Sequence, residues 1–361
     1  AIPGLAVAAV VDGKIDYVET FGYANIKQSK AVTKQTLFNI ASISKPIMGI
    51  ALLQLAEQGQ IDLDEDINTY LSFKVDNPKV IGDRITIRHL ASHSSSIDDF
   101  YDITSYSINE DASISLKHHL MSLLTKGGSL YNNGEYYLDS MPGEKRKYSN
   151  LGAALAGHIV EEVTGLTLAQ YSKKHLFPRL AMNETSWLIN GLDKTNIATP
   201  YEVEQCIPYV FICSDTESPK LNHVIGEYFN PSSEFKNYSE YPHFGNPQYP
   251  DGGIRASIQE MGNLLVSILT NTDAIGAPLL SDTMFSEMFK LQLTNDVSTT
   301  QRFFWRDRRG FIGHMGSDLG VFTSMYFDPK SRTGVVILMN RGVDAKASSA
   351  MQKIAMAAMK I

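Results

Sequence analysis

A serine and a lysine three positions apart, Ser42 and Lys45, stand just before an apolar run at residues 47–56. The run is apolar on nearly every face and Gly59 follows it, which predicts a buried helix that ends near this glycine. If Ser42 lies on the first turn, positions i and i+3 share a helix face, and the hydroxyl and the amine meet. A serine becomes a nucleophile when a neighbouring base takes its proton, so the spacing suggests such a pair. An N-cap serine beside a solvated lysine gives the same pattern and stays open.

Two further polar groups stand at the edges of predicted elements. Tyr148 and Asn150 come just ahead of the amphipathic segment 151–165, whose last residue is a glycine, so they should lie at a helix start and face a cleft. His314 and Gly316 lie at the end of a predicted strand near the C-terminus. The strands predicted in this third of the chain are 301–305, 311–316, 322–327 and 334–339.

The elements around these residues predict an α+β fold. Residues 6–11 and 14–23 flank Asp12-Gly13, which favours a β-hairpin. A capping box at residues 257–260 opens a helix to about residue 270, and an Ala- and Met-rich helix is expected at 345–361. Strands at both ends with helices between them predict one antiparallel sheet built from both termini, flanked by helices, with a mostly helical inserted region.

This pattern also suggests a division of the chain. Residues 1–60 and 250–361 would form the α/β region that carries the sheet, and residues 61–249 a helical and loop region. We find no repeat and no linker-like segment, so residues 1–361 are expected to form one catalytic unit.

Composition excludes several classes of function. The chain has 361 residues, 43% of them hydrophobic, and a formal net charge of −7 without a Lys/Arg-rich block. This balance argues against nucleic acid or an anionic membrane surface as a partner. No apolar stretch approaches the length of a transmembrane helix. The sequence opens at Ala1 without a signal segment, so a periplasmic or secreted protein with its signal removed is expected, with a cytoplasmic protein as the alternative.

No cofactor or metal is expected from the sequence. His89 and His93 have zinc-like spacing but no third ligand follows, and the acidic run at 62–66 lacks the glycine and the final glutamate of a calcium loop. Cys206 and Cys213 are the only cysteines, and either two free thiols or one bridge across a local hairpin fits them. Aromatic residues crowd between positions 201 and 251, where they either pack over the core or shape a substrate pocket.

Taken together, the polar signals resemble those of a known family. In chain order they are Ser42-x-x-Lys45, Tyr148-Ser149-Asn150 and His314-Met315-Gly316. The order and the flanking sequence resemble the penicillin-recognising serine hydrolases, which include class C β-lactamases, D,D-carboxypeptidases, D-aminopeptidases and related esterases. The resemblance covers essentially the whole chain, with family-like sequence at residues 38–59, 85–93, 142–165, 252–261 and 313–329.

The resemblance implies roles for the three central residues. Ser42 would be the nucleophile, Lys45 would share or remove its proton, and Tyr148 would carry a proton to the leaving group and later help to activate water. A phenol is a weak base near neutrality unless a cation lies beside it, and Lys45 is the obvious cation.

Four further positions would bind the substrate, namely Asn150, His314, Gly316 and Ser317. By the same resemblance, Asn150 and His314 would orient the substrate amide. The oxyanion hole would consist of the backbone N–H of Ser42 and that of Ser317, which follows Gly316.

One departure from the family bears on the substrate. Many members carry lysine where this chain has His314, and a histidine is only partly charged near neutral pH, so a substrate carboxylate should be held less firmly. We therefore expect an acyl-Ser42 hydrolase of D-amino acid peptides and amides or short-chain esters, with weak β-lactam hydrolysis. Turnover of carboxylate-bearing substrates should improve as the pH falls towards 6.

Other functions stay open at this point. They are a β-lactamase or D,D-carboxypeptidase proper, an acyltransferase, and a non-catalytic penicillin-binding sensor. An α/β-hydrolase would need a Gly-x-Ser-x-Gly elbow, which the sequence lacks. The expected partner is a small-molecule or peptide substrate, and the oligomeric state is unknown.

Overall fold

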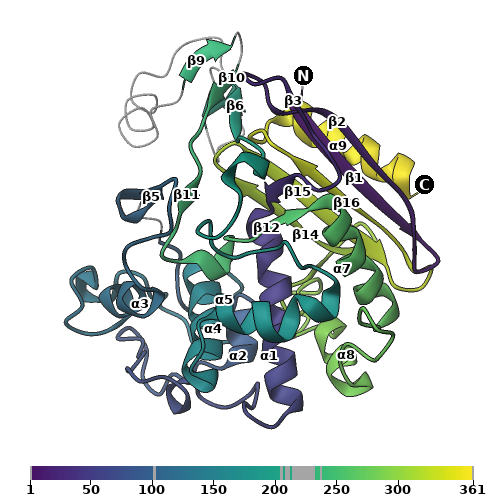
Figure 1. Ribbon diagram of the computed structural model, residues 1–361. Helices are drawn as coiled ribbons and strands as arrows, with labels where there is room; N and C mark the ends of the chain where they lie inside the picture. Colours follow the sequence, from purple (N-terminus) through teal and green to yellow (C-terminus); the bar gives the residue numbers. More distant parts are fainter. Residues whose placement is uncertain are drawn as a thin grey trace.

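An antiparallel sheet of seven strands joins the two ends of the chain (Figure 1). The computed structural model describes residues 2–100, 103–203, 206–207, 212–213, 232–235 and 238–359. The strand order is β13-β14-β15-β16-β1-β2-β3. The sheet with flanking helices confirms the α+β fold predicted from the sequence. The strands are β1 (Gly4–Val11), β2 (Lys14–Asn25), β3 (Lys30–Ala31), β13 (Arg306–Arg308), β14 (Phe311–Asp318), β15 (Val321–Asp328) and β16 (Thr333–Met339).

The pairing of β1 with β16 closes this sheet. Ala6 lies opposite Leu338 in an antiparallel register, and both side chains are fully buried. The predicted hairpin between β1 and β2 is present, and both of its turn residues, Asp12 and Gly13, have positive φ. Aspartate and glycine tolerate this conformation better than most residues, which explains why the turn forms here.

The strand predicted at residues 301–305 is wrong, because the edge strand β13 begins at Arg306. Phe303, Phe304 and Trp305 are all buried, whereas a strand would place consecutive side chains on opposite faces. Phe304 has a φ of 57°, and its N–H donates to the Ala91 carbonyl at 2.8 Å. The chain therefore turns into the core here and becomes a strand only afterwards.

Helix α1 (Ser44–Glu57) occupies the centre of the molecule on the inner side of the sheet (Figure 1). It contacts α4 and α8, while α7 packs on β1 and β16. On the other side of the sheet lies α9 (Ala345–Ala358), which contacts β16. The remaining helices are α2 (Ile87–Ala91), α3 (Leu116–Leu124), α4 (Asn150–Thr164), α5 (Leu168–Tyr171), α7 (Ile258–Thr270) and α8 (Asp282–Phe289).

Several short strands lie outside the main sheet. Strand β4 (Leu37–Asn39), just ahead of α1, pairs with β12 (Arg255–Ser257), just ahead of α7. The capping box predicted at the start of α7 is present, with Ser257 and Glu260 as its two residues. The other strands are β5 (Ser107–Ile108), β6 (Tyr201–Val203), β7 (Cys206–Ile207), β8 (Ile212–Cys213), β9 (Ser232–Phe235), β10 (Tyr238–Glu240) and β11 (Phe244–Gly245).

Some sequence-based expectations stay predictions. Strands β7 and β8 pair with Cys206 opposite Cys213, but the cysteine side chains lie outside the described part of the chain. Most of the aromatic segment expected to cover the core or shape a pocket also lies outside it. The division at residues 60 and 250 is likewise untested. Of the helices that the structure describes, each is too short or too polar to cross a bilayer.

Candidate active site

Ser42 lies in a single 3-10 turn, Ala41–Ile43, that leads directly into α1. The sequence placed it on the first turn of the helix itself, and the difference arises because Ala41 has a φ of 47°, which interrupts regular helix. The Asn39 side chain holds the strained position by accepting the Ala41 N–H at 2.7 Å. Strain of this kind gathers at functional sites. It leaves Ser42 half-exposed at the mouth of a buried helix.

Lys45 is fully buried, and its ammonium group makes three hydrogen bonds. Nζ donates to Ser42 Oγ at 3.0 Å, to Asn150 Oδ1 at 2.6 Å and to the Asp251 carbonyl oxygen at 2.5 Å. An ammonium has three donors and no acceptor, so the three acceptors match its charged form. The contact of Lys45 with Ser42 predicted from their spacing is confirmed.

A carboxylate at the start of α4 fixes the orientation of the Asn150 amide. Asp99 Oδ2 accepts from Asn150 Nδ2 at 2.7 Å, and Asp99 Oδ1 accepts from the backbone N–H of Asn150 at 2.9 Å and of Leu151 at 3.2 Å. Because Asp99 takes the amide nitrogen, the amide oxygen faces Lys45. The carboxylate also lies at a helix N-terminus, where negative charge is favourable.

Tyr148 lies over the same ammonium group. Lys45 Nζ is 5.1 Å from the centroid of the phenol ring, within the range of a cation–π contact. The ring of His93 packs on Tyr148 at a centroid distance of 4.3 Å, and that of His314 lies 6.3 Å away. Ser149 caps the following helix, since its Oγ accepts the Gly152 N–H at 2.8 Å. The cap and the two rings hold Tyr148 beside Lys45.

The strand β14 closes the other side of the site. At Gly316 the 3-10 turn of Ser42 lies so close that a Cβ would collide with the Ile40 carbonyl oxygen and the Thr323 hydroxyl. Thr323 Oγ1 donates to this same carbonyl at 2.9 Å. Gly316 is thus needed for close approach, and it brings the neighbouring Ser317 to the turn that carries the nucleophile. The oxyanion roles of the Ser42 and Ser317 N–H groups stay a prediction.

His314 differs from the sequence-based expectation in its charge. Burial, assisted by the charge of Lys45, lowers the pKa of His314 to about 3. The ring is therefore neutral near pH 7, and the partial charge expected from the sequence is wrong. Its Nδ1 lies 2.7 Å from the Met315 carbonyl oxygen, which can only accept, so Nδ1 carries the hydrogen. The remaining ring nitrogen, Nε2, is then an acceptor.

Comparison with known proteins identifies the family of this chain. A family model described as Beta-lactamase matches residues 1–358. The chain belongs to the beta-lactamase family. Protein flp of Staphylococcus aureus strain MRSA252 is 28% identical over 256 residues, which is 67% of this chain and 48% of that protein. The chain therefore spans about half the length of this curated relative.

Solved structures show the same fold. D-amino acid amidase from Ochrobactrum anthropi SV3 superposes with a TM-score of 0.76 at 19% identity, covering 100% of this chain and 95% of that one. A penicillin-binding protein from Bacillus halodurans gives a TM-score of 0.70 at 21% identity, covering 97% and 95%. The family and the fold are those of serine hydrolases, as the resemblance read from the sequence implied.

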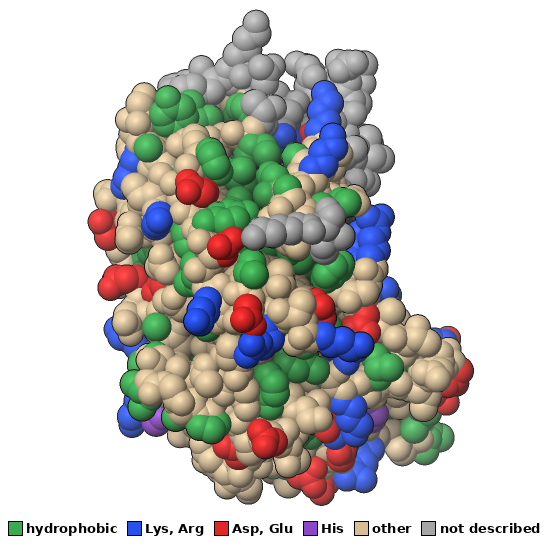
Figure 2. All heavy atoms as spheres, turned by 90° about the vertical axis from the view of Figure 1, so that its right-hand side faces the viewer, with side chains coloured by type: hydrophobic (Ala, Val, Ile, Leu, Met, Phe, Trp, Pro, Cys, Tyr) green, Lys and Arg blue, Asp and Glu red, His purple; other side chains and the backbone are tan. Residues whose placement is uncertain are grey.

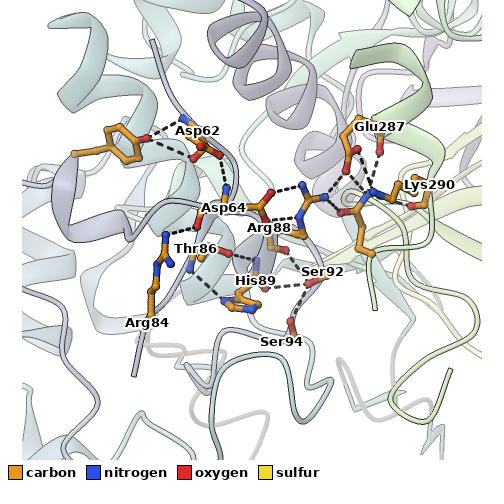
Figure 3. Close-up of polar contacts among 12 residues, drawn as sticks. Asp62, Asp64, Arg84, Thr86, Arg88, His89, Ser92, Ser94, Glu287 and Lys290 are labelled. Atoms are coloured by element: carbon orange, nitrogen blue, oxygen red, sulfur yellow. Dashed lines mark hydrogen bonds and ion pairs between the residues drawn. The ribbon is translucent and has the colours of Figure 1, made fainter. Parts of the chain in front are cut away.

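A polar network around α2 extends to Ser94, in the loop that follows this helix (Figure 3). Arg88 lies between the carboxylates of Asp64 and Glu287 and pairs with both. Ser92 Oγ donates to the Arg88 carbonyl at 2.7 Å and lies 2.8 Å from Ser94 Oγ, so the network continues into the loop. Asp64, from the acidic run considered for calcium, therefore has a structural partner.

The two histidines considered for zinc also have structural contacts. His89 completes the capping box of α2, since its Nδ1 accepts the Thr86 N–H at 3.2 Å. His93 packs on Tyr148, and its Nδ1 accepts the Ser149 N–H at 3.3 Å. Its carbonyl accepts the Lys147 N–H at 2.8 Å. His93 thus ties the loop after α2 to the segment that presents Tyr148.

Three contributors to the site were missed at the level of sequence. They are the carboxylate of Asp99, the ring of His93 and the backbone carbonyl of Asp251. Asp99 stands in the polar loop after His93, and Asp251 immediately precedes Gly252-Gly253, a turn evident in the sequence. The position of Asp99 and Asp251 in a loop and beside a turn was the only feature of the sequence that could have indicated their role.

Proposed function

We propose that this protein is a serine hydrolase that works through an acyl-Ser42 intermediate on amide or ester substrates. The observation that carries the proposal is the triple hydrogen bonding of the Lys45 ammonium to Ser42, Asn150 and Asp251. A cation held on the serine oxygen stabilises the negative charge that this oxygen gains as its proton leaves. A lysine with only a structural role would have no need of a half-exposed hydroxyl as partner.

The proton acceptor in this scheme is Tyr148. Lys45 offers no lone pair while its three donors are engaged, so it acts as the cation and the phenol oxygen acts as the base. As Ser42 Oγ bonds to the acyl carbon, its proton passes to the Tyr148 oxygen while the proton of the Tyr148 O–H passes to the leaving amine or alcohol, and the bond from the acyl carbon to the leaving group breaks. Water repeats the sequence in reverse and frees Ser42. The N–H groups of Ser42 and Ser317 would hold the oxyanion.

The substrate class follows from His314. With Nδ1–H turned to the Met315 carbonyl, Nε2 accepts a hydrogen bond and suits an ammonium or amide N–H better than a carboxylate. D-amino acid amides and peptides with a free amino group present such a donor. Short-chain esters have no carboxylate that the site must bind. The structural likeness to D-amino acid amidase supports this choice. Weak β-lactam hydrolysis is expected.

Intact mass spectrometry tests the acyl-enzyme directly. The wild-type protein and Ser42→Ala should be incubated with a panel of D-amino acid amides, p-nitrophenyl esters and β-lactams. A mass increase equal to the acyl group should appear in the wild type alone, and Ser42→Ala should lose turnover while keeping its melting temperature. Retained turnover in Ser42→Ala above a few per cent would remove Ser42 from the mechanism.

The same measurement separates the alternative functions. An adduct that forms and is never released indicates a penicillin-binding sensor. An adduct that is discharged faster by added amine or alcohol than by water, with the acyl group transferred, indicates an acyltransferase. A hydrolase releases the free acid, and the adduct then decays at the rate of turnover.

Substrate preference is tested with His314→Lys. Values of kcat/KM should be measured for nitrocefin, a D-Ala-D-Ala peptide, D-Ala-p-nitroanilide and p-nitrophenyl butyrate. A lysine supplies a full charge, so the variant should shift preference towards the two carboxylate-bearing substrates. Because the pKa of His314 is lowered to about 3, the gain near pH 6 expected from the sequence no longer follows for the wild type. Nitrocefin turnover at the efficiency of a dedicated lactamase would contradict the proposal.

A second candidate, a β-lactamase or D,D-carboxypeptidase proper, is favoured by one residue. Arg146 stands two positions before Tyr148 and donates from Nε to Gln301 at 2.6 Å. Within the described residues it pairs with no carboxylate, and burial together with nearby Arg306 lowers its pKa. A substrate carboxylate would relieve this crowding of positive charge.

Arg146→Gln distinguishes the two candidates. If Arg146 holds a substrate carboxylate, the variant should lose at least about tenfold in kcat/KM on nitrocefin and the D-Ala-D-Ala peptide but not on p-nitrophenyl butyrate. Lys145→Gln, its exposed neighbour, is the matched control. Equal losses on all substrates would show that Arg146 only positions the segment before Tyr148.

A further inference from the structure

Three ionisable side chains lie close together and largely buried on one face of α4. The side chain of His158 is 3% exposed, and those of Glu161 and Glu162 are 15% exposed. Charged side chains ordinarily stay in water, and on the face drawn in Figure 2 those of lysine, arginine, aspartate and glutamate are spread over the surface. Taking charges out of water is costly unless partners compensate for it. The partners of this group on α4 therefore matter.

His158 lies between the two carboxylates. Its Nδ1 is 2.8 Å from Glu161 Oε2, and its Nε2 is 3.0 Å from Glu162 Oε1. An ionised carboxylate only accepts, so the two contacts match an imidazolium ring, which donates from both nitrogens. Glu162 Oε1 also accepts from the Ser72 hydroxyl at 2.6 Å and lies 3.2 Å from Lys117 Nζ. The ring thus fixes Oε2 of Glu161 and leaves Oε1 for other donors.

The second carboxylate oxygen of Glu161 joins α4 to the active site. Glu161 Oε1 accepts from the Tyr249 hydroxyl at 2.6 Å and from the Leu168 N–H at 3.1 Å. Tyr249 begins the 3-10 turn Tyr249–Asp251, here called the Asp251 turn, which contacts both α4 and α1. Burial raises the pKa of Tyr249 well above 10, with the charge of Glu161 as the second cause, so the phenol stays a donor.

A close backbone approach presses the Asp251 turn against the same face of α4. A Cβ on Gly157 would lie 2.4 Å from Pro250 Cβ, so the proline ring packs directly on the helix backbone. Gly157 and Glu161 are four positions apart and therefore share a helix face. One contact is apolar and the other is a hydrogen bond, and together they fix the turn at two points.

Helix α4 thereby determines the place of two of the three acceptors of Lys45. Asn150, the first residue of the helix, offers its Oδ1 directly. The Asp251 carbonyl oxygen, which accepts from Lys45 Nζ at 2.5 Å, belongs to the turn that Glu161 and Gly157 hold.

We infer that His158, Glu161 and Tyr249 are positioning residues that hold the Asp251 carbonyl at the Lys45 ammonium. His158 orients the Glu161 carboxylate, Glu161 holds the Tyr249 hydroxyl, and the backbone of the Asp251 turn carries the effect to Lys45. The consequence for turnover rests on the proposed function, because there the cation must lie at the Ser42 oxygen as negative charge develops.

Tyr249→Phe tests the inference, since it removes the hydroxyl and keeps the ring that packs against Trp187. We expect kcat to fall about tenfold with KM unchanged, because a small displacement of a catalytic group costs up to about 10²-fold. Tyr171→Phe is the matched control. It removes another buried tyrosine hydroxyl, which donates to Gln54 at 3.4 Å, and should turn over as the wild type does. Equal kcat in Tyr249→Phe and the wild type would overturn the inference.

Two substitutions of Glu161 separate positioning from a general structural role. In Glu161→Gln the amide oxygen still accepts the Tyr249 hydroxyl and the amide nitrogen donates to a neutral His158, so kcat should stay within about threefold of the wild type. Glu161→Ala removes the acceptor and should lower kcat as much as Tyr249→Phe does. Combining Glu161→Ala with Tyr249→Phe should cause no further loss, since both break one contact. Losses that multiply in the double variant would contradict the inference.

The rate at which a fluorophosphonate labels Ser42 distinguishes failure of this inference from failure of the proposed function. The wild type should be labelled and Ser42→Ala should not. Tyr249→Phe should be labelled about tenfold more slowly than the wild type and Tyr171→Phe. Equal rates would overturn the inference and leave the nucleophile in place. A wild type that is not labelled would remove the proposed function, and the inference with it.

Discussion

Polar side chains on the two faces of the β14–β15 hairpin differ in their hydrogen bonding. Side chains alternate along each strand, so His314 and Gly316 face the nucleophile while Met315, between them, faces the side of the sheet that carries α9. On β15, Thr323 points inward and donates to the Ile40 carbonyl, whereas the next residue, Ser324, points outward, and none of the described residues forms a hydrogen bond with its hydroxyl. The inner face of these two strands thus borders the candidate active site, and the outer face lies on the side of α9.

The difference concerns preorganisation. On the inner side, Asp99, Asn150, Lys45 and Ser42 form a continuous chain of hydrogen bonds. Fixed donors and dipoles stabilise a transition state without reorganising at the moment of reaction. On the outer side, the buried hydroxyl of Ser324 has no hydrogen-bond partner among the described residues. Variants on the inner side should therefore damage turnover, and those on the outer side should spare it.

The largest effect is expected at the centre of the inner side. Lys45→Ala and Tyr148→Phe should each lower kcat at least about 10²-fold, and the double variant should be little worse, because groups that act as a unit are not additive. Lys45→Ala also leaves the acceptors on Asn150 and Asp251 without their donor. Single-turnover rates of the two single variants and the double variant give the coupling. Losses that multiply strictly would show that the two residues act independently.

Two substitutions on the hairpin itself test the difference between its two faces. Gly316→Ala forces a methyl group against the Ile40 carbonyl and should push the turn of Ser42 away, lowering kcat/KM by about tenfold or more and stability by about 1–3 kcal/mol. Ser324→Ala, on the outer face, removes an unpartnered hydroxyl and should leave kcat/KM unchanged with equal or higher stability. Kinetics and urea unfolding of both variants provide the check. A similar loss of turnover in both variants would contradict the view that only the inner face contributes to catalysis.

Much of this arrangement was predictable from local sequence patterns. The hairpin at Asp12-Gly13, the buried helix after Ser42 and the capping box at Ser257 are each specified by a few neighbouring residues, and each is present. The order of Ser42, Tyr148 and His314 indicated the family. These features depend on periodicity, turn chemistry and capping, which act over less than about two turns of helix.

The features of the site that could not be predicted from the sequence depend on contacts between distant segments. Asp99 meets Asn150 across 51 positions, and Lys45 meets the Asp251 carbonyl across 206. No periodicity marks such contacts. The charge of His314 was misjudged for the same reason, since its neutral state follows from burial and from Lys45 on a remote helix. At residues 301–305, three aromatic side chains imitated a strand but were all drawn into the core.

A smaller effect is expected at the outer end of the hydrogen-bonded chain. Asp99→Asn keeps the size of the side chain but removes its charge and places an N–H₂ group where Asp99 accepts, so the Asn150 amide should lose its fixed orientation and Lys45 an acceptor. We expect kcat to fall about tenfold with little change in KM, since a misplaced positioning group costs up to about 10²-fold. Asp98→Asn is the matched control, because that carboxylate pairs with the surface residue Lys147. Equal effects of the two substitutions would reduce Asp99 to a general structural role.

The smallest expected effect is the pH dependence of the free energy of unfolding. It arises from two histidines on the inner side of the sheet. Burial lowers the pKa of His93, with Lys45 as the second cause, and lowers that of His314 to about 3. Both rings lie against Tyr148 on the inner side. An unfolded histidine titrates near 6.5, so below this pH the unfolded chain binds more protons than the folded protein. The free energy of unfolding should therefore fall with the pH, by about 1 kcal/mol for His314 between pH 7.5 and 5.5, and the lowered pKa of His93 acts in the same direction.

Urea unfolding of the wild type, His314→Gln and the exposed-residue control His118→Gln at pH 7.5, 6.5 and 5.5 measures this dependence. His314→Gln should flatten the decline by about 1 kcal/mol over the range, and His118→Gln should follow the wild type. Only the slope is informative, because a substitution in the site also shifts stability at every pH. If stability rises on acidification, or if the His314→Gln and wild-type slopes coincide, His314 is not held neutral by its surroundings, and the argument that its Nε2 accepts a substrate N–H loses its basis.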